Sequence, residues 1–369
     1  MEIPETEHYQ GTLLAIEEIN AAAGVLGKPI HPVCYDPESD LAKYRQLADR
    51  LLVEDEVSVI FGCCTSSSRK AVLSSIERRN ALLWYPTLYE GFEYSPNVIY
   101  TGPTPSQNAL PLARFLQRNY GDRIYLIGSD YIYPRESNRV MRDVMERLGG
   151  ELLDEVYVPM DASSAELRRH AEVACKARPD AIFSTLVGVA GTRFIEHCID
   201  LGLDGRRTPI ASHNMSEGDF LVIGRGERSA GHITSAPYFS SVQCAASHRF
   251  VEAYRQCYGA RAPVSQYAEA AYNSVHLFAR ALTHAGVLDT QRLVAAAHHV
   301  ELDAPQGSIT LDEDNNHAWL WPRIGIWNGR DAFDIAWEAG DRVNADPFMV
   351  FYGGPEEMLD SALVAVTEN

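Results

Sequence analysis

The apolar residues of this chain alternate along its length between short continuous runs and a helical spacing of about 3.6 residues. Residues 57–61 and 124–127 are apolar runs with β-branched side chains, as in strands buried on both faces of a sheet. Residues 7–23 and 135–148 instead place their apolar side chains on one face of a helix. Because strands that alternate with helices form parallel sheets, we expect an α/β fold with doubly wound parallel sheets.

The length of 369 residues exceeds the size at which a single hydrophobic core stops growing, so we expect two lobes. The other elements continue the same alternation. Strands are expected at residues 29–35, 81–84, 155–158, 181–184 and 209–211, and helices from residue 40, after residue 68, and at residues 165–176 and 191–201.

The start of the chain departs from this pattern. A doubly wound lobe normally opens with a strand, but this chain opens on the helical pattern of residues 7–23. A missing central strand exposes apolar side chains on both of its neighbours. We therefore expect that the first strand of lobe one is absent from the sequence through truncation at Met1.

The composition of the chain indicates which binding partners, location and cofactors to expect. The chain carries 50 acidic and 32 basic residues, a formal charge of −18 that repels phosphate backbones, so we expect no direct nucleic-acid binding. We expect no membrane span, because no run of 18 apolar residues occurs. Residues 1–5 lack the features of a secretory signal, which predicts a cytoplasmic protein. The seven scattered cysteines form no disulfide framework and no metal-ligand spacing, so we expect no metal and no cofactor.

Polar and aromatic residues gather where the predicted strands end, which is where ligands bind in open α/β sheets. Three serines beginning at Ser66 follow the strand at 57–61 and open a helix. Hydroxyl and free N–H groups there either cap the helix or bind a carbonyl oxygen or an anion. Two tyrosine-rich segments, residues 84–97 and 128–138, follow two further strands. Such segments serve either as packing or as facing walls of one cleft.

Signatures of catalysis are scarce in this sequence. Neither a Gly-x-Ser-x-Gly elbow nor a His-Glu-x-x-His motif occurs, and glycine-rich phosphate-binding loops are missing. Cys64, Glu90 and Lys70 could in principle hydrolyse an amide through a thioester. Nothing in the local sequence activates that thiol, so we expect a binding protein without catalytic residues.

Two segments carry a resemblance to a known family. Residues 85–97, Tyr-Pro-Thr-Leu-Tyr-Glu-Gly-Phe-Glu-Tyr-Ser-Pro-Asn, and residues 128–138, Gly-Ser-Asp-Tyr-Ile-Tyr-Pro-Arg-Glu-Ser-Asn, closely resemble the amide-sensing regulators called AmiC. These regulators have the type I periplasmic-binding-protein fold, as do the urea-binding components of ABC importers. The resemblance implies two lobes joined by three chain crossings. Lobe one is then residues 1–101 and 238–317, and lobe two is residues 102–237 and 318–369.

The resemblance also implies where the ligand lies. Ser66, Tyr85 and Thr87 of lobe one, with Tyr131 and Tyr133 of lobe two, match the family's contacts to an amide held between the lobes. A neutral amide offers a carbonyl acceptor and N–H donors, which hydroxyl and backbone groups satisfy without a buried charge.

This chain departs from the regulators at several positions near the expected ligand. Cys64 and Thr65 replace a Tyr-Met pair, and Leu88 replaces a proline. His213, Asn214 and Met215 replace a Leu-Thr-Thr run. We therefore predict a roomier or differently polar pocket than that of the acetamide-binding regulators.

Three functions follow as hypotheses. The first is a cytoplasmic sensor of small neutral amides that represses amide-degrading genes by sequestering an RNA-binding antiterminator protein, released on lobe closure. The alternative is an extracytoplasmic substrate-binding component that serves an ABC permease for urea, short-chain amides or branched-chain amino acids. That alternative implies a periplasmic location, with a signal peptide before Met1. The third is an amide hydrolase.

Overall fold

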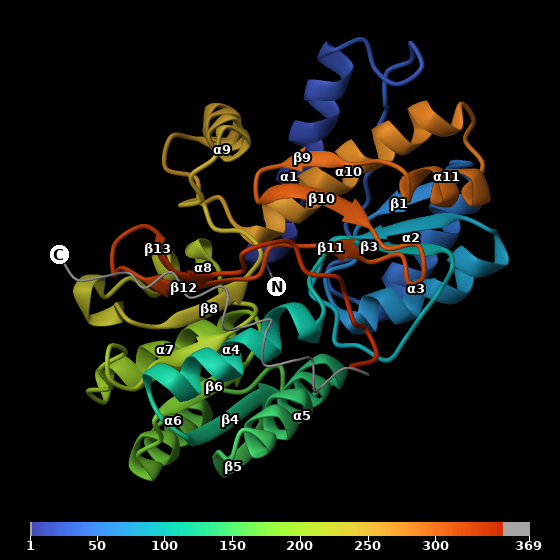
Figure 1. The fold of residues 1–369 in the computed structure, drawn as a ribbon. Coiled ribbons are helices and arrows are strands. Elements are labelled where there is room, and N and C mark those ends of the chain that lie inside the picture. Colours follow the sequence, from blue (N-terminus) through green and yellow to red (C-terminus); the bar gives the residue numbers. More distant parts are fainter. Residues whose placement is uncertain (1, 350–369) are drawn as a thin grey trace.

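The computed structural model describes residues 2–349, and the strands of that part of the chain form three sheets (Figure 1). A small parallel sheet has the order β1-β2-β3, with β1 at Val59–Phe61, β2 at Leu82–Tyr85 and β3 at Val98–Tyr100. A small antiparallel sheet has the order β11-β10-β9, with β9 at Leu302–Ala304, β10 at Gly307–Leu311 and β11 at Ala318–Trp319.

The largest sheet has seven strands in the order β13-β12-β8-β7-β6-β4-β5. Its parallel strands are β4 at Arg123–Ser129, β5 at Glu151–Val158, β6 at Ala181–Thr185, β7 at Ile210–Ser212 and β8 at Ile233–Ala236. Two antiparallel strands, β12 at Arg323–Trp327 and β13 at Phe333–Glu338, extend the β8 edge.

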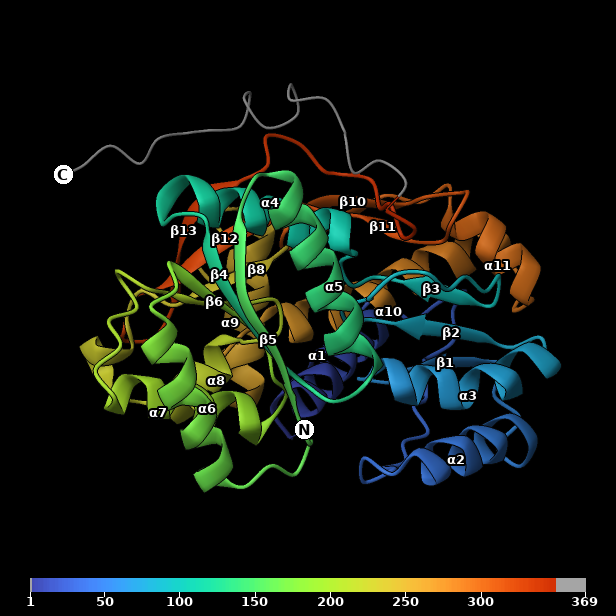
Figure 2. The ribbon, with the colours of Figure 1, turned by 90° about the horizontal axis from the view of Figure 1, so that it is seen from below.

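The described residues form eleven α-helices, and the two views show helices on both faces of the large sheet (Figures 1 and 2). They are α1 at Glu2–Ala21, α2 at Leu41–Val53, α3 at Ser66–Arg78, α4 at Pro105–Asn119, α5 at Ile132–Arg147, α6 at Ser164–Ala177, α7 at Val189–Asp200, α8 at Glu217–Ile223, α9 at Ala245–Tyr258, α10 at Gln266–Ala285 and α11 at Thr290–Ala297. No helix among these residues has the length and apolar character needed to cross a membrane.

Strand β4 shows why the apolar runs predicted the large sheet correctly. Tyr125 and Ile127 lie in the core beneath α6 and α7, whereas Ile124 and Leu126 lie in the core beneath α4 and α5 (Figure 2). All four side chains are buried because helices cover both faces of the sheet. The prediction of an α/β fold built on largely parallel sheets is confirmed.

The chain changes sheet at three places. Strands that precede residue 101 and strands from 302 to 319 belong to the small sheets, and those of 123–236 and 323–338 belong to the large one. The changes lie between β3 and α4, after β8, and between β11 and β12. The exact lobe boundaries, including residues 350–369, which lie outside the described residues, stay a prediction.

Helix α1 packs closely along α10, and this packing brings the first turn of α1 toward the centre of the molecule (Figure 2). At Gly11 the two backbones approach so closely that a Cβ atom would lie 2.1 Å from the backbone oxygen of Ala268. Only glycine fits such a contact.

The strand predicted at residues 29–35 is wrong. This segment forms no strand in the structure, and its Val33 and Cys34 side chains are exposed. A strand needs the N–H and C=O groups of a neighbour, and β1 pairs only with β2, leaving its other edge open in the described chain. The described residues begin with α1, and the loss of a first strand through truncation at Met1 stays a prediction.

Candidate ligand-binding site

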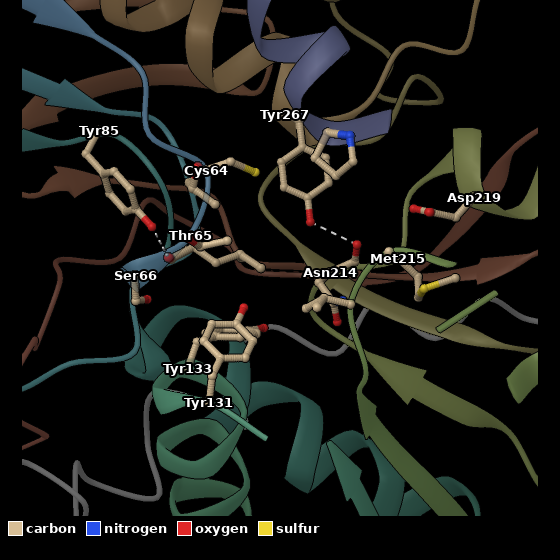
Figure 3. Close-up of a pocket in the computed structure, with 15 residues that line it drawn as sticks. Cys64, Thr65, Ser66, Tyr85, Tyr131, Tyr133, Asn214, Met215, Asp219 and Tyr267 are labelled. Atoms are coloured by element: carbon tan, nitrogen blue, oxygen red, sulfur yellow. Dashed lines mark hydrogen bonds between the residues drawn. The ribbon is translucent and has the colours of Figure 1, made fainter. Parts of the chain in front are cut away.

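A small cavity lies where the strand ends of the small parallel sheet face those of the large sheet (Figure 3). Its volume of about 40 Å³ has room for about three water-sized groups. Segments that follow β1, β2, β4, β6 and β7 line it, together with the first turns of α1 and α10. The lining residues are Pro4, Cys64, Thr65, Ser66, Tyr85, Thr87, Leu88, Tyr131, Tyr133, Val187, Gly188, Asn214, Met215, Asp219 and Tyr267.

The three predicted residues from the small sheet present hydroxyl groups that already donate within the protein. Ser66 is the first residue of α3 and donates to the carboxylate of Glu90. Tyr85 donates to the backbone oxygen of Leu88 at 3.3 Å, and Thr87 donates to the backbone oxygen of Cys63 at 3.2 Å. A hydroxyl that has donated its one hydrogen still has lone pairs, so these oxygens can accept from a ligand N–H.

The two predicted tyrosines from the large sheet form the opposite wall. Tyr131 is the residue before α5 and Tyr133 lies in its first turn, with ring centroids 6.2 Å apart. The Tyr133 hydroxyl is buried next to Ser137, and no group in residues 2–349 meets hydrogen-bond geometry with it. Burial raises the pKa of both phenols, which therefore stay protonated donors. The Tyr133 hydroxyl, which has no described partner, can donate to a ligand carbonyl oxygen.

A buried network of charged side chains lies behind the cavity wall that Ser66, Tyr85 and Thr87 form. Arg69 is fully buried, and its guanidinium contacts Glu90 at 3.0 Å and Glu93 at 3.1 Å. Lys70 pairs with the second oxygen of Glu93. The same guanidinium lies 4.8 Å from the ring centre of Tyr85 and so holds this cavity-lining ring in place. Two cations balance two carboxylates, so the network leaves no positive charge for a ligand.

The proposed Cys64, Glu90 and Lys70 set does not form a catalytic arrangement in the structure. Glu90 is held by Ser66 and Arg69, and Lys70 is paired with Glu93. Burial raises the pKa of the Cys64 thiol, which opposes formation of the thiolate nucleophile.

Residues 213–215, together with the start of α10, complete the site. Asn214 donates from Nδ2 to the backbone oxygen of Leu186 at 2.7 Å. Tyr267 of α10 donates to the backbone oxygen of Asn214 at 2.8 Å (Figure 3). Asp219 closes this side, and burial raises the pKa of its carboxyl to about 6. Among the described residues, no group of three or more histidine, cysteine or acidic side chains could hold a metal ion.

A sequence comparison decides the family of this chain. The family described as "Periplasmic binding protein domain" matches residues 1–353. The chain belongs to the periplasmic binding protein family. This membership fits a site placed between two sheets at their strand ends.

Solved structures of other periplasmic binding proteins have the same fold. A solute-binding protein of an ABC transporter from Rhodopseudomonas palustris BisB5, in complex with 3,4-dihydroxybenzoic acid, superposes with a TM-score of 0.81 at 21% identity, covering 92% of this chain and 94% of that chain. The branched-chain amino acid binding protein LivJ from Streptococcus pneumoniae, in complex with isoleucine, gives a TM-score of 0.77 at 20% identity, covering 89% and 94%. At these identities, the similarity establishes the type I fold of this family.

One curated protein is similar over a shorter stretch. Limonene hydroxylase from Geobacillus stearothermophilus is 28% identical over 120 residues, which is 32% of this chain and 22% of that protein. The matched stretch therefore spans about a fifth of the relative's length.

In this periplasmic binding protein, all five residues predicted from the sequence line one cavity, and their contact with a ligand stays a prediction. The positions where the chain departs from the regulators and that also line the cavity are Cys64, Thr65, Leu88, Asn214 and Met215. His213 does not line it. Its ring is buried against Phe183, and burial lowers its pKa to about 3.

Tyr267 and Arg69 were missed by the sequence reasoning. Tyr267 opens α10, so nothing in its local sequence distinguishes it from a helix residue that packs in the core. Arg69 lies within α3, where an arginine is ordinarily a solvated surface residue.

Proposed function

We propose that this protein binds a small neutral amide or urea-like molecule between its two parallel sheets, as the solute-binding component of an ABC importer. The observation that carries this proposal is the cavity lining. It combines hydroxyl groups, one side-chain amide and apolar surfaces, and none of its fifteen residues is lysine, arginine or histidine.

The charges around the cavity favour a neutral ligand. A carboxylate ligand is stable in a buried site only with a cation or several donors to balance it. Arg69 is already occupied by Glu90 and Glu93. The Glu90 carboxylate also bonds Ser66 at the start of α3, where an anionic ligand could otherwise use the helix N-terminus. Asp219 adds a further acidic group at the lining.

The size of the cavity favours a ligand of a few heavy atoms. A volume of about 40 Å³ suits a short amide or urea far better than a benzoate ring or a leucine-sized side chain. The structural neighbours named for 3,4-dihydroxybenzoic acid and isoleucine bind larger, charged molecules. We therefore propose a ligand class different from theirs within the same fold.

The importer role is supported by the neighbours as a group. Those solved with ligands are named as binding proteins of transporters. With this role, we propose an extracytoplasmic location and an ABC permease as the partner. The closed form would dock on the permease and deliver its ligand, since a ligand that prefers the closed state shifts the population toward it.

A cytoplasmic amide sensor is the second candidate. The observation that favours it is that both regulator-like segments, through Tyr85 and Tyr131, supply opposite walls of the same cavity. In this role an RNA-binding antiterminator protein takes the place of the permease as partner. Uptake of a labelled amide by cells or vesicles that contain the cognate permease supports the importer, whereas ligand-reversible binding of an antiterminator supports the sensor.

A thermal-shift panel tests the ligand class. The purified chain is heated with acetamide, propionamide, butyramide and urea, and separately with leucine, isoleucine, benzoate and 4-hydroxybenzoate. A ligand at about 100 times its Kd raises stability by about 2.7 kcal/mol. We expect the midpoint to rise only with members of the first set. A rise with benzoates or amino acids alone would overturn the proposed ligand class.

A further inference from the structure

Asn214 is fixed in the cavity wall with its amide oxygen free. Its Nδ2 atom donates to the backbone oxygen of Leu186 at 2.7 Å. Because a backbone carbonyl only accepts, this bond establishes which end of the side chain is the nitrogen. Oδ1 is buried and has no hydrogen-bond partner within residues 2–349, and Asn214 as a whole is only 9% exposed.

The backbone around Asn214 is held by the start of helix α10. Tyr267 donates to the backbone oxygen of Asn214 at 2.8 Å, and Gln266 donates to that of His213 at 2.9 Å. With the bond to Leu186, two hydrogen bonds fix Asn214 and a third fixes the residue before it, while the one strong side-chain acceptor of Asn214 stays unused. Buried polar groups are almost always paired in folded proteins, so an unpaired acceptor facing a cavity indicates a missing donor.

A complementary group lies nearby in the same cavity. Tyr131 and Tyr133 line the same cavity as Asn214 (Figure 3). The Tyr133 hydroxyl is a buried donor that lacks a described partner. The site therefore presents one free acceptor and one free donor, both uncharged, to a molecule of a few heavy atoms. A primary amide or urea has the matching pair, an N–H donor next to a carbonyl acceptor.

We propose that Asn214 Oδ1 accepts a hydrogen bond from a ligand N–H and thereby selects carbonyl compounds that carry an N–H over ketones and carboxylates of the same shape. The proposal rests on the proposed function and adds the residue that sets its selectivity. A ketone leaves Oδ1 unpaired, and a carboxylate brings a second acceptor against it. Sites built to pair with a ligand N–H reject analogues that lack it far more strongly than they reject an extra methylene group.

Matched ligand pairs provide the test. Acetone has the shape of acetamide without its N–H groups, and butanone stands in the same relation to propionamide. Binding to the full chain is measured by calorimetry, with competition titration for weak ligands. We expect each amide to bind at least about tenfold more tightly than its ketone. Equal affinities in the unaltered protein would overturn the proposal without recourse to any variant.

The variant Asn214→Leu has the same branched arrangement of side-chain heavy atoms and no polar atoms. We expect it to lower amide affinity at least about tenfold and ketone affinity less than about threefold, so that discrimination is lost. Met215→Leu, at the neighbouring lining position, is the control and should change both affinities alike. A merely structural role of Asn214 predicts parallel losses for amide and ketone, and that outcome would refute the proposal.

Asn214→Thr guards against a variant that does not fold. Its hydroxyl retains an acceptor, so we expect it to keep part of the preference for amides, and full loss of the preference contradicts the role of Oδ1. If the unaltered protein binds no amide at all, the proposed function itself fails. If it binds amides with a preference that Asn214→Leu leaves intact, only the present inference fails.

Discussion

The hydroxyl group of Tyr267 donates a hydrogen bond of 2.8 Å to the backbone oxygen of Asn214. Tyr267 opens α10, which packs against β1 and β2 of the small sheet, whereas Asn214 follows β7 of the large sheet. The bond therefore ties the two sheets together at the cavity wall. Gln266 adds a parallel bond to the preceding residue, His213. The segment that carries the proposed ligand acceptor, His213 and Asn214, therefore also connects the large sheet to helix α10.

Loss of the hydrogen bond between Tyr267 and Asn214 should weaken the form in which the small parallel sheet and the large sheet close around the ligand. We expect Tyr267→Phe to lower ligand affinity about three- to tenfold, because a hydrogen bond of this kind contributes about 1 kcal/mol. Small-angle scattering of the ligand-bound variant should show a larger radius of gyration than that of the ligand-bound unaltered protein. Tyr272→Phe is a matched control, since Tyr272 lies on the same helix and donates to Glu18 away from the cavity. An affinity loss without any change in radius would assign Tyr267 to ligand contact alone.

The buried pair of Arg69 and Glu90 should respond asymmetrically to substitution. Arg69→Met leaves the Glu90 carboxylate buried without its cation, and we expect a loss of about 3–5 kcal/mol in the free energy of unfolding. The double variant Arg69→Met/Glu90→Gln removes both charges and should lose markedly less. Differential scanning calorimetry without added ligand measures both changes. Equal losses would show that the charge pairing is not what stabilises this wall.

The stability that Asp219 and Glu217 contribute should fall as pH rises from about 4 to about 7. Burial raises the pKa of Asp219 from 3.8 to about 6 and that of Glu217 from 4.5 to about 7. Each carboxyl binds its proton more tightly in the folded chain than in the unfolded one. The resulting stability is complete below the unfolded-state value and is lost as pH passes the folded-state value.

Thermal unfolding at a series of pH values measures this effect. Asp219→Asn and Glu217→Gln keep a neutral side chain at all pH values, so each variant should lose its part of this fall. Between about pH 4 and about pH 7 we expect the midpoint of each variant to change more favourably with rising pH than that of the unaltered protein. A pH dependence that both substitutions leave unchanged would assign the effect to other groups.

The thiol of Cys64 should react slowly. Burial raises its pKa, so little thiolate is present at about pH 8, whereas Cys257 is exposed. We expect iodoacetamide to label Cys257 well before Cys64, as followed by mass spectrometry of peptides. We also expect no ammonia release from acetamide or urea. Rapid labelling of Cys64 together with ammonia release would favour the hydrolase hypothesis instead.

The fold was predictable because its main signal is local. Strand β4 is buried on both faces, so its sequence is a continuous apolar run that needs no knowledge of its neighbours. Residues 29–35 carry a weaker run, and whether they form a strand depends on a partner that the sequence does not reveal. The structure has an open edge at β1, and this segment forms no strand.

The candidate site was predictable only in part. Tyr85 ends a strand, and Ser66 and Tyr131 lie in the segments that follow strands. The carboxyl ends of parallel strands meet at one edge of a sheet. Tyr267 and Asn214 are 53 positions apart and meet only after the two sheets face each other. No sequence pattern encodes that contact. Asn214 Oδ1 is unpaired because the other atom of its amide, Nδ2, bonds Leu186, and the sequence does not reveal that contact.

The central claim, a neutral amide-type ligand, is tested most directly by calorimetric titration of the same preparation with acetamide and with acetate. The two have nearly the same shape and differ in charge and in N–H groups. We predict saturable binding of acetamide at one site per chain and no measurable heat of binding with acetate. Saturable binding of acetate with none of acetamide would contradict the account.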